Sequence, residues 1–146
     1  MTILRMDNVG IVVDDLEAAI AFFEDLGLEV EGRTEVEGPW ADMTVGIEGV
    51  RCAIAMMRTP DGSGRFELAE YLAPGVIPAS PAKPPHNTLG MHRVMFAVDD
   101  IEDTVARLSR HGGELVGGIA RFENSYLLCY LRGPAGIFLG LGEKLN

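Results

Sequence analysis

The chain has 146 residues, 47% of them hydrophobic, and a formal net charge of −10. This length fits one domain with its own core. The acidic balance argues against nucleic acid or an anionic membrane as a partner, because both need clustered Lys and Arg.

The two cysteines, Cys52 and Cys129, lie in separate apolar runs and lack the close spacing of a zinc site. No signal-peptide pattern or membrane-length apolar run is present, so we expect a cytoplasmic protein.

The first half of the chain predicts a strand, a helix and three further strands. Branched apolar residues alternate over about 3–13, as in a half-buried strand. Asp14 and Asp15 can cap the helix that apolar spacing predicts over about 16–26, and Gly27 ends it. Gly38-Pro39-Trp40 breaks the chain after the second strand. The later strands are expected at about 28–36, 50–58 and 65–72.

The same order of elements returns with a constant offset of 85 residues. Met6 pairs with Met91 and Glu17 with Glu102, and Gly27 and Gly112 follow the two helices. A repeat of this length is typical of one supersecondary unit used twice. We therefore predict an α+β domain over 1–146, with two βαβββ modules at about 1–72 and 91–146 and a Pro-rich connection at about 73–90. The second module has a helix at about 101–111 and strands at about 91–98, 114–122, 125–132 and 136–143.

Strand alternation predicts which side chains face away from the helices. Val9, Ile11 and Val13 are expected to pack on the first helix, so their neighbours point to the opposite side. The same reasoning applies to the last strand of the first module and to both end strands of the second. Four comparable positions then face a concavity that the curled sheet encloses: Asn8, Glu67, Arg93 and Gly140.

Three motifs carry a resemblance to a known family. They are N-V-G-I-V-V-D-D-L-E-A-A-I-A-F-F at 8–23, R-V-M-F-A-V-D-D-I at 93–101 and R-G-P-A-G-I at 132–137. Together with the paired modules they resemble the vicinal oxygen chelate superfamily, which includes glyoxalase I, bleomycin-resistance proteins, methylmalonyl-CoA epimerase and extradiol dioxygenases. The resemblance implies a curled mixed-sheet cup and a homodimer. Whether one chain or two chains supply the modules of a cup stays open.

The resemblance also implies a metal site, but this chain lacks most of the ligands of that site. Metal-using members offer a His from the first strand and a Glu from the last strand of each module. This chain has Asn8, Glu67, Arg93 and Gly140 at those positions, so only Glu67 matches. Arginine stays protonated and glycine has no side chain, so we expect no cofactor and disfavour a divalent metal. Arg93 is predicted to pair with Glu67, either as a ligand-binding cation or as a satisfied ion pair.

Other residues are candidates for lining the cup, each with a structural alternative. Trp40, in a loop before the third strand, could line a pocket or cover the core. The methionines Met57 and Met95 could form an adaptable lining or fill the core. Tyr71 and Tyr126 could offer phenol groups or make structural hydrogen bonds. His86 and His92 are interpreted as surface or loop histidines.

Two functional hypotheses follow for this chain. In the first, the protein binds a small organic molecule in the cup without the metal of the family. In the second, it is a lyase or isomerase of the glyoxalase or epimerase type, with Glu67 as general base and Arg93 holding an oxyanion or carboxylate. The lost ligands argue against a metal-dependent glyoxalase-like enzyme and against a dioxygenase, which needs iron with open positions.

Overall fold

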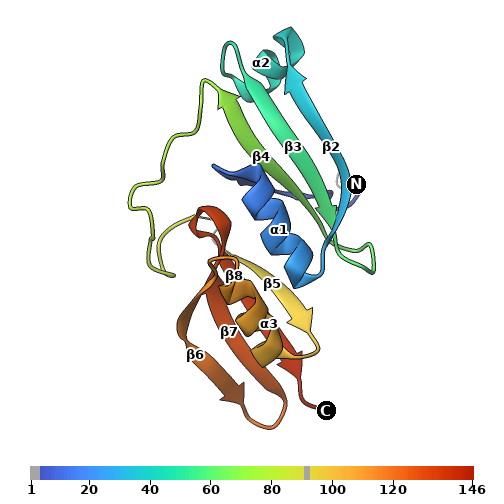
Figure 1. Ribbon diagram of the computed structural model, residues 1–146, viewed down its shortest axis with the longest axis vertical. Coiled ribbons are helices and arrows are strands. Elements are labelled where there is room, and N and C mark those ends of the chain that lie inside the picture. The colour runs from blue at the N-terminus through green and yellow to red at the C-terminus, as the bar shows by residue number, and fades with distance from the viewer. Residues whose placement is uncertain (1–3, 91–92) are drawn as a thin grey trace. The chain divides into compact units, whose positions relative to one another are not determined.

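The computed structural model describes residues 4–90 and 93–146. The chain divides into two units, unit 1 with residues 1–77 and unit 2 with residues 78–146. This boundary falls inside the Pro-rich stretch predicted at about 73–90. Each unit holds a four-stranded mixed sheet with a long helix on one face (Figure 1).

Unit 1 has the sheet order β1-β4-β3-β2, in which β1 runs parallel to β4 and the other pairs are antiparallel. Helix α1 packs on this sheet through buried apolar residues on one side of the helix, and the rings of Phe23 and Phe66 meet edge to face at 5.1 Å. The elements are β1 (Val9–Val12), α1 (Leu16–Leu26), β2 (Glu29–Glu37), α2 (Pro39–Val45), β3 (Arg51–Arg58) and β4 (Arg65–Ala73).

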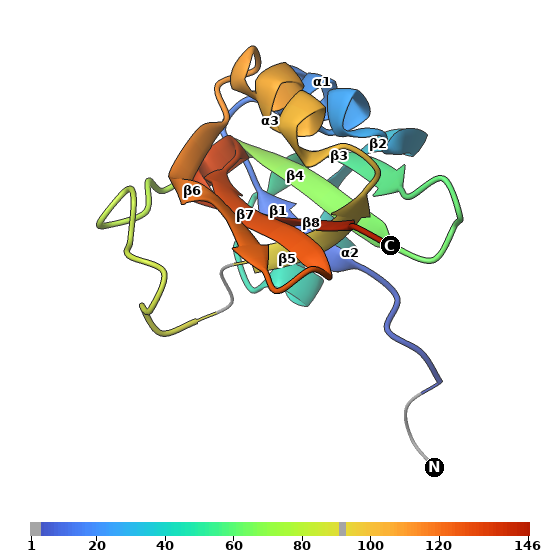
Figure 2. The ribbon, with the colours of Figure 1, turned by 90° about the horizontal axis from the view of Figure 1, so that it is seen from below.

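Unit 2 repeats this arrangement with the sheet order β5-β8-β7-β6, and β5 is parallel to β8. Helix α3 lies over one face of the sheet (Figure 2), where the fully buried Leu108, Leu131 and Leu141 form part of the core. The elements are β5 (Arg93–Val98), α3 (Ile101–Ser109), β6 (Glu114–Phe122), β7 (Tyr126–Arg132), a 3₁₀ turn (Pro134–Gly136) and β8 (Phe138–Lys144).

The helix starts are built in the same way in both units. The Asp15 carboxylate accepts a hydrogen bond from the backbone N–H of Ala18 at 3.0 Å, and Asp100 accepts one from Asp103 at 2.9 Å. These are side-chain caps that satisfy free N–H groups at a helix N-terminus. The Asp-Asp pairs of the sequence repeat therefore have the predicted role.

The order of strands and long helices agrees with the sequence prediction, and two details differ. The first strand is shorter than expected, because residues 4–8 are not in a strand. Residues 3, 91 and 92, which the prediction placed in strands, lie outside the described residues. Helix α2 was not predicted. Among the described residues, the helices are too short or too polar to span a membrane.

Candidate functional site

The sheet face of unit 1 that α1 leaves uncovered carries Glu67. This residue of β4 lies beside Gly10 of β1 and Met56 of β3, and its side chain is half-buried. Within the described part of unit 1, no hydrogen bond or ion pair engages the Glu67 carboxylate. Its oxygens therefore remain available, in this unit, to accept hydrogen bonds or a proton.

Two further predicted residues of unit 1 lie near this face or at its edge. Tyr71 is half-buried on β4 and pairs with Cys52 of β3. Burial raises the pKa of the Cys52 thiol, and the negative charge of Glu67 raises this pKa further. Asn8 precedes β1, is exposed, and donates a weak hydrogen bond to Asp7 at 3.4 Å.

Two predictions for unit 1 need correction. Met57 was a candidate for lining the ligand site or for filling the core, and the second role applies, because its side chain is fully buried on the helix-covered face, where it pairs with Phe66. Met56 is the methionine that shares a face with Glu67. Trp40 was expected in a loop and instead lies in α2, where its side chain is 61% exposed. Proline is favoured at the first turn of a helix, so Pro39 starts α2 rather than breaking the chain.

The uncovered sheet face of unit 2 carries Arg93 at the start of β5. Its Nη1 donates a hydrogen bond to the Tyr130 hydroxyl at 2.6 Å, and its guanidinium carbon lies 5.6 Å from the Tyr130 ring centroid. Within the described residues of unit 2, no carboxylate forms an ion pair with Arg93. A guanidinium has five N–H donors, so most of its donor capacity stays unused in this unit.

Gly140 of β8 lies between Tyr130 of β7 and Met95 of β5, its register neighbours. A Cβ built on Gly140 would overlap the Met95 sulfur and come within 3.1 Å of Tyr130 Cε1. The space that a side chain at position 140 needs is therefore already filled.

An aromatic cluster completes this face of unit 2. The His86 imidazole stacks on the Phe138 ring at 4.5 Å with an interplanar angle of 19°, and meets the Tyr130 ring edge to face at 4.4 Å. The Arg132 guanidinium lies 4.3 Å from the centroid of the Phe138 ring. Its Nη2 donates to the Pro84 carbonyl oxygen at 2.6 Å, which holds the segment before His86 against the sheet.

Sequence reasoning missed most of this cluster. Alternation along β7 places Tyr126, Tyr130 and Arg132 on the same side of the strand, so Tyr130 could have been predicted together with Tyr126. His86 is a loop histidine, as expected, but it packs on the sheet. Tyr126 itself begins β7 and is 41% exposed, four residues from Tyr130 along the strand. His92 lies outside the described residues.

The predicted Arg93–Glu67 pair joins residues of different units, so it stays a prediction. The metal site that the resemblance implies can be tested on the donor set. Within residues 4–90 and 93–146, no three His, Cys, Asp or Glu side chains form a group that could hold a metal ion. At the family positions, Arg93 is a cation, and Gly140 has neither a side chain nor room for one. These residues do not fit a divalent metal.

The mixed-sheet units with one long helix each define a glyoxalase-type α+β fold. The chain belongs to the Glyoxalase/Bleomycin resistance protein/Dioxygenase superfamily, whose family model matches residues 5–141. Among proteins with curated functional descriptions, none matches the chain significantly.

Solved structures support this membership. A glyoxalase family protein from Bacillus cereus is 52% identical to the chain, with a TM-score of 0.93 and coverage of 100% of this chain and 97% of that one. An antibiotic binding protein from Streptomyces sp. CB03234 is 18% identical, with a TM-score of 0.59 and coverage of 99% and 98%. A trypanothione-dependent glyoxalase I from Leishmania major is 18% identical, with a TM-score of 0.62 and coverage of 94% and 85%. The last two likenesses concern the fold alone.

Proposed function

We propose that this chain binds a small organic molecule on the uncovered sheet faces of its units, without the divalent metal of the family's enzymes. The observation that carries the proposal is the chemistry at two family metal positions. Arg93 places a guanidinium there, and Met95 fills the space at Gly140. A fixed organic cation replaces the metal and holds a carboxylate or enolate-like oxygen of the ligand.

The fold is compatible with binding as well as with catalysis. An antibiotic binding protein and a glyoxalase I both share it, so the function must be argued from the site. Arg93 is exposed, Met95 is 50% exposed and Tyr130 is half-buried, so a ligand can reach charged, apolar and phenolic groups on one face. Binding sites for small molecules combine apolar surface with a few polar groups in this way.

Metal analysis tests the first part of the proposal. The protein is purified without chelator, equilibrated with Zn²⁺, Ni²⁺ or Mn²⁺, desalted and measured by elemental analysis. We expect far less than one ion per chain. One tightly bound divalent ion per chain, lost in an Asn8→Ala/Glu67→Gln protein, would contradict it.

A thermal-shift screen tests the second part. The panel contains antibiotics, thiol adducts of α-ketoaldehydes and aromatic carboxylates, each measured with and without EDTA. A ligand that binds only the folded state raises the melting temperature. We expect at least one compound to do so equally in both conditions. A panel in which every stabilising compound loses its effect in EDTA would count against metal-independent binding.

A second candidate function is a lyase or isomerase in which Glu67 is the general base. The observation in its favour is that the half-buried Glu67 carboxylate has no partner within the described part of unit 1, beside the apolar Met56. Glu67→Gln removes the base and keeps the shape. If the protein is an enzyme, turnover of a ligand from the screen falls strongly while affinity is kept.

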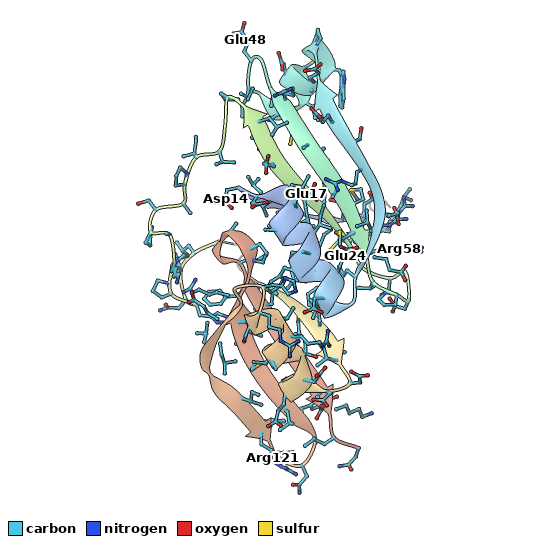
Figure 3. All side chains as sticks on the ribbon, viewed as in Figure 1. Asp14, Glu17, Glu24, Glu48, Arg58 and Arg121 are labelled. Carbon is cyan, nitrogen blue, oxygen red and sulfur yellow. The ribbon has the colours of Figure 1, made fainter. Side chains whose placement is uncertain are left out.

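Glu48→Gln is the matched control for that experiment. Glu48 is exposed in the loop between α2 and β3 and points outward (Figure 3). Unchanged binding and unchanged turnover in Glu67→Gln would remove Glu67 from catalysis and leave the binding function.

The remaining expectations are part of the same proposal. We propose a cytoplasmic homodimer that interacts with a small-molecule ligand rather than with nucleic acid or membranes. Light scattering after gel filtration tests the oligomeric state, and a mass equal to one chain would contradict the dimer.

A further inference from the structure

We propose that the uncovered sheet face of unit 2 selects a planar carboxylate, with Arg93 and Tyr130 binding the carboxylate and His86 contacting the flat ring. This inference rests on the proposed function, because it names the class of ligand for that protein. These three residues and Met95 define the unit 2 face.

The cationic end of this face has unused hydrogen-bond donors. Arg93 donates one N–H to the Tyr130 hydroxyl at 2.6 Å, and the hydroxyl that accepts this bond keeps its own O–H to donate. A carboxylate next to both groups can therefore accept from the guanidinium and from the phenol. Such charge-assisted bonds are stronger than bonds between neutral groups. The chain has a net charge of −10, so most of it repels anions. Arg93, which has no carboxylate partner among the described residues of its own unit, is therefore a specific binding position for an anion.

Next to this cationic group the face accepts flat rings, since Phe138 is the register neighbour of Arg93. The chain's own imidazole, His86, stacks on Phe138 at 4.5 Å and meets Tyr130 edge to face at 4.4 Å. His86 is half-buried, so part of this residue remains accessible to a ligand. Aromatic rings prefer such offset-stacked and edge-to-face contacts, which discriminate flat from puckered ligands.

The position of His86 is fixed by contacts on both sides of it in the chain. Arg132 donates to the Pro84 carbonyl oxygen at 2.6 Å, and the Thr88 hydroxyl donates to the Pro85 carbonyl oxygen at 2.7 Å. A ring held in place before binding loses less conformational entropy when the ligand arrives, so His86 is preorganised for stacking.

Met95 forms an apolar wall of this face, beside Gly140 and next to Arg93 and Tyr130 in the register of the sheet. Its side chain lies over Gly140 and Gly142, because a Cβ on either glycine would meet the thioether. Methionine adapts its shape to different apolar ligands. Glycine at position 140 therefore serves ligand binding, because it makes room for Met95 next to Tyr130.

Isothermal titration with three small probes tests the inference. The probes are naphthalene-2-carboxylate, naphthalene-2-carboxamide, which keeps the ring and lacks the charge, and cyclohexanecarboxylate, which keeps the charge and lacks the flat ring. We expect the naphthalene acid to bind about tenfold or more tightly than its amide, as a charged hydrogen bond predicts. We expect it to bind several-fold more tightly than the cyclohexane acid, as ring stacking predicts.

Variants assign the two preferences to residues. Arg93→Gln should remove the difference between acid and amide, and His86→Ala should remove the difference between flat and puckered acids. Arg121→Gln is the matched control, since Arg121 lies near the end of β6 in the same unit, is exposed, and donates to Glu123 and Asn124 of the following turn (Figure 3). It should keep both preferences. In the wild-type protein, stacking should also move the His86 ring proton resonances upfield, a readout that needs no variant.

The outcomes separate this inference from the proposed function. Equal affinity for acid and amide, or an Arg93→Gln protein that still prefers the acid, contradicts the inference. If the naphthalene acid does not bind while a neutral compound of the thermal-shift panel does, the inference fails and the proposed function stands. If neither the naphthalene acid nor any compound of the panel binds, both fail.

Discussion

The side chain of Met95 lies across the backbone of Gly140 in unit 2, and the two residues are register neighbours on β5 and β8. A Cβ at Gly142, two residues further along β8, would be 3.2 Å from Met95 Cε. The two glycines of β8 therefore leave a channel for one methionine. A Cβ at Gly140 would also lie 3.1 Å from Cε1 of Tyr130, the residue that accepts the hydrogen bond from Arg93.

Adding a methyl group at position 140 should destabilise the protein through this contact. We expect Gly140→Ala to lower the free energy of unfolding by about 1–3 kcal/mol, because overpacking forces side chains out of their preferred conformations. Urea denaturation followed by circular dichroism measures the change. Gly118→Ala in β6 is the control, since a Cβ there has nothing within 4 Å.

A double-mutant cycle assigns this cost to Met95. The loss caused by Gly140→Ala should shrink in a Met95→Ala background, because the overlapping sulfur is gone. Additive effects of the two substitutions would show that the cost has another origin.

In each unit, a carboxylate from the last strand accepts a hydrogen bond at the N-terminus of the long helix. The backbone N–H of Leu16 donates to Glu70 at 2.9 Å, and that of Ile101 donates to Glu143 at 3.0 Å. A negative charge at a helix N-terminus stabilises the helix dipole and satisfies a free N–H. We expect Glu70→Ala and Glu143→Ala each to lower the free energy of unfolding by about 1–2 kcal/mol.

Chemical denaturation measures both effects. Glu48→Ala should change stability by less than about 0.5 kcal/mol, as exposed substitutions usually do. If Glu70→Ala and Glu143→Ala matched that control, the two contacts would have no energetic role.

Arg132 should control how firmly residues 82–88 are held on unit 2. We expect Arg132→Met to speed amide hydrogen exchange and proteolysis in this segment, because it removes the bond to Pro84 and the contact with Phe138. Mass spectrometry after exchange measures the effect. Lys83→Met is the control, since its ion pair with Glu114 is exposed and such pairs stabilise little. Equal exchange in both variants would argue against this role of Arg132.

The sequence predicted the fold well because its signals are local and repeated. The Asp-Asp starts and the helical spacing act within about one turn of chain, and the structure uses them in both units. The predicted glycine end holds for α1, which Gly27 caps, whereas α3 ends at Ser109 with Arg110 as its C-cap. Helix α2 was missed because Gly38-Pro39 is a turn signal and also a helix start, and seven residues give too short a pattern to distinguish them.

The site was harder to predict than the fold because it depends on contacts between distant residues. Two adjacent methionines, Met56 and Met57, face opposite sides of β3, and only the register with β4 shows which one lies beside Glu67. His86 stacks on Phe138 of β8, and the segment before it is held by the hydrogen bond from Arg132 to Pro84, 48 residues away in the chain. Neither contact leaves a periodic signal in the sequence.

The buried thiol of Cys129 predicts how stability changes in alkaline solution. Burial raises the pKa of this thiol from its ordinary value of 9.0 to about 11. Between these values the unfolded chain loses a proton that the folded chain keeps, so the unfolded state binds fewer protons. The free energy of unfolding should therefore fall as the pH rises from about 9 to about 11, by roughly 2 kcal/mol from this group.

Urea denaturation at several pH values compares the wild-type protein with Cys129→Ala. The substitution costs a constant amount of stability for its cavity and removes the thiol, so its curve should fall less steeply above pH 9. All other titratable groups are the same in the two proteins, so their contribution cancels in the comparison. Parallel curves would show that Cys129 ionises as readily in the folded chain as in the unfolded one, contrary to its burial on β7.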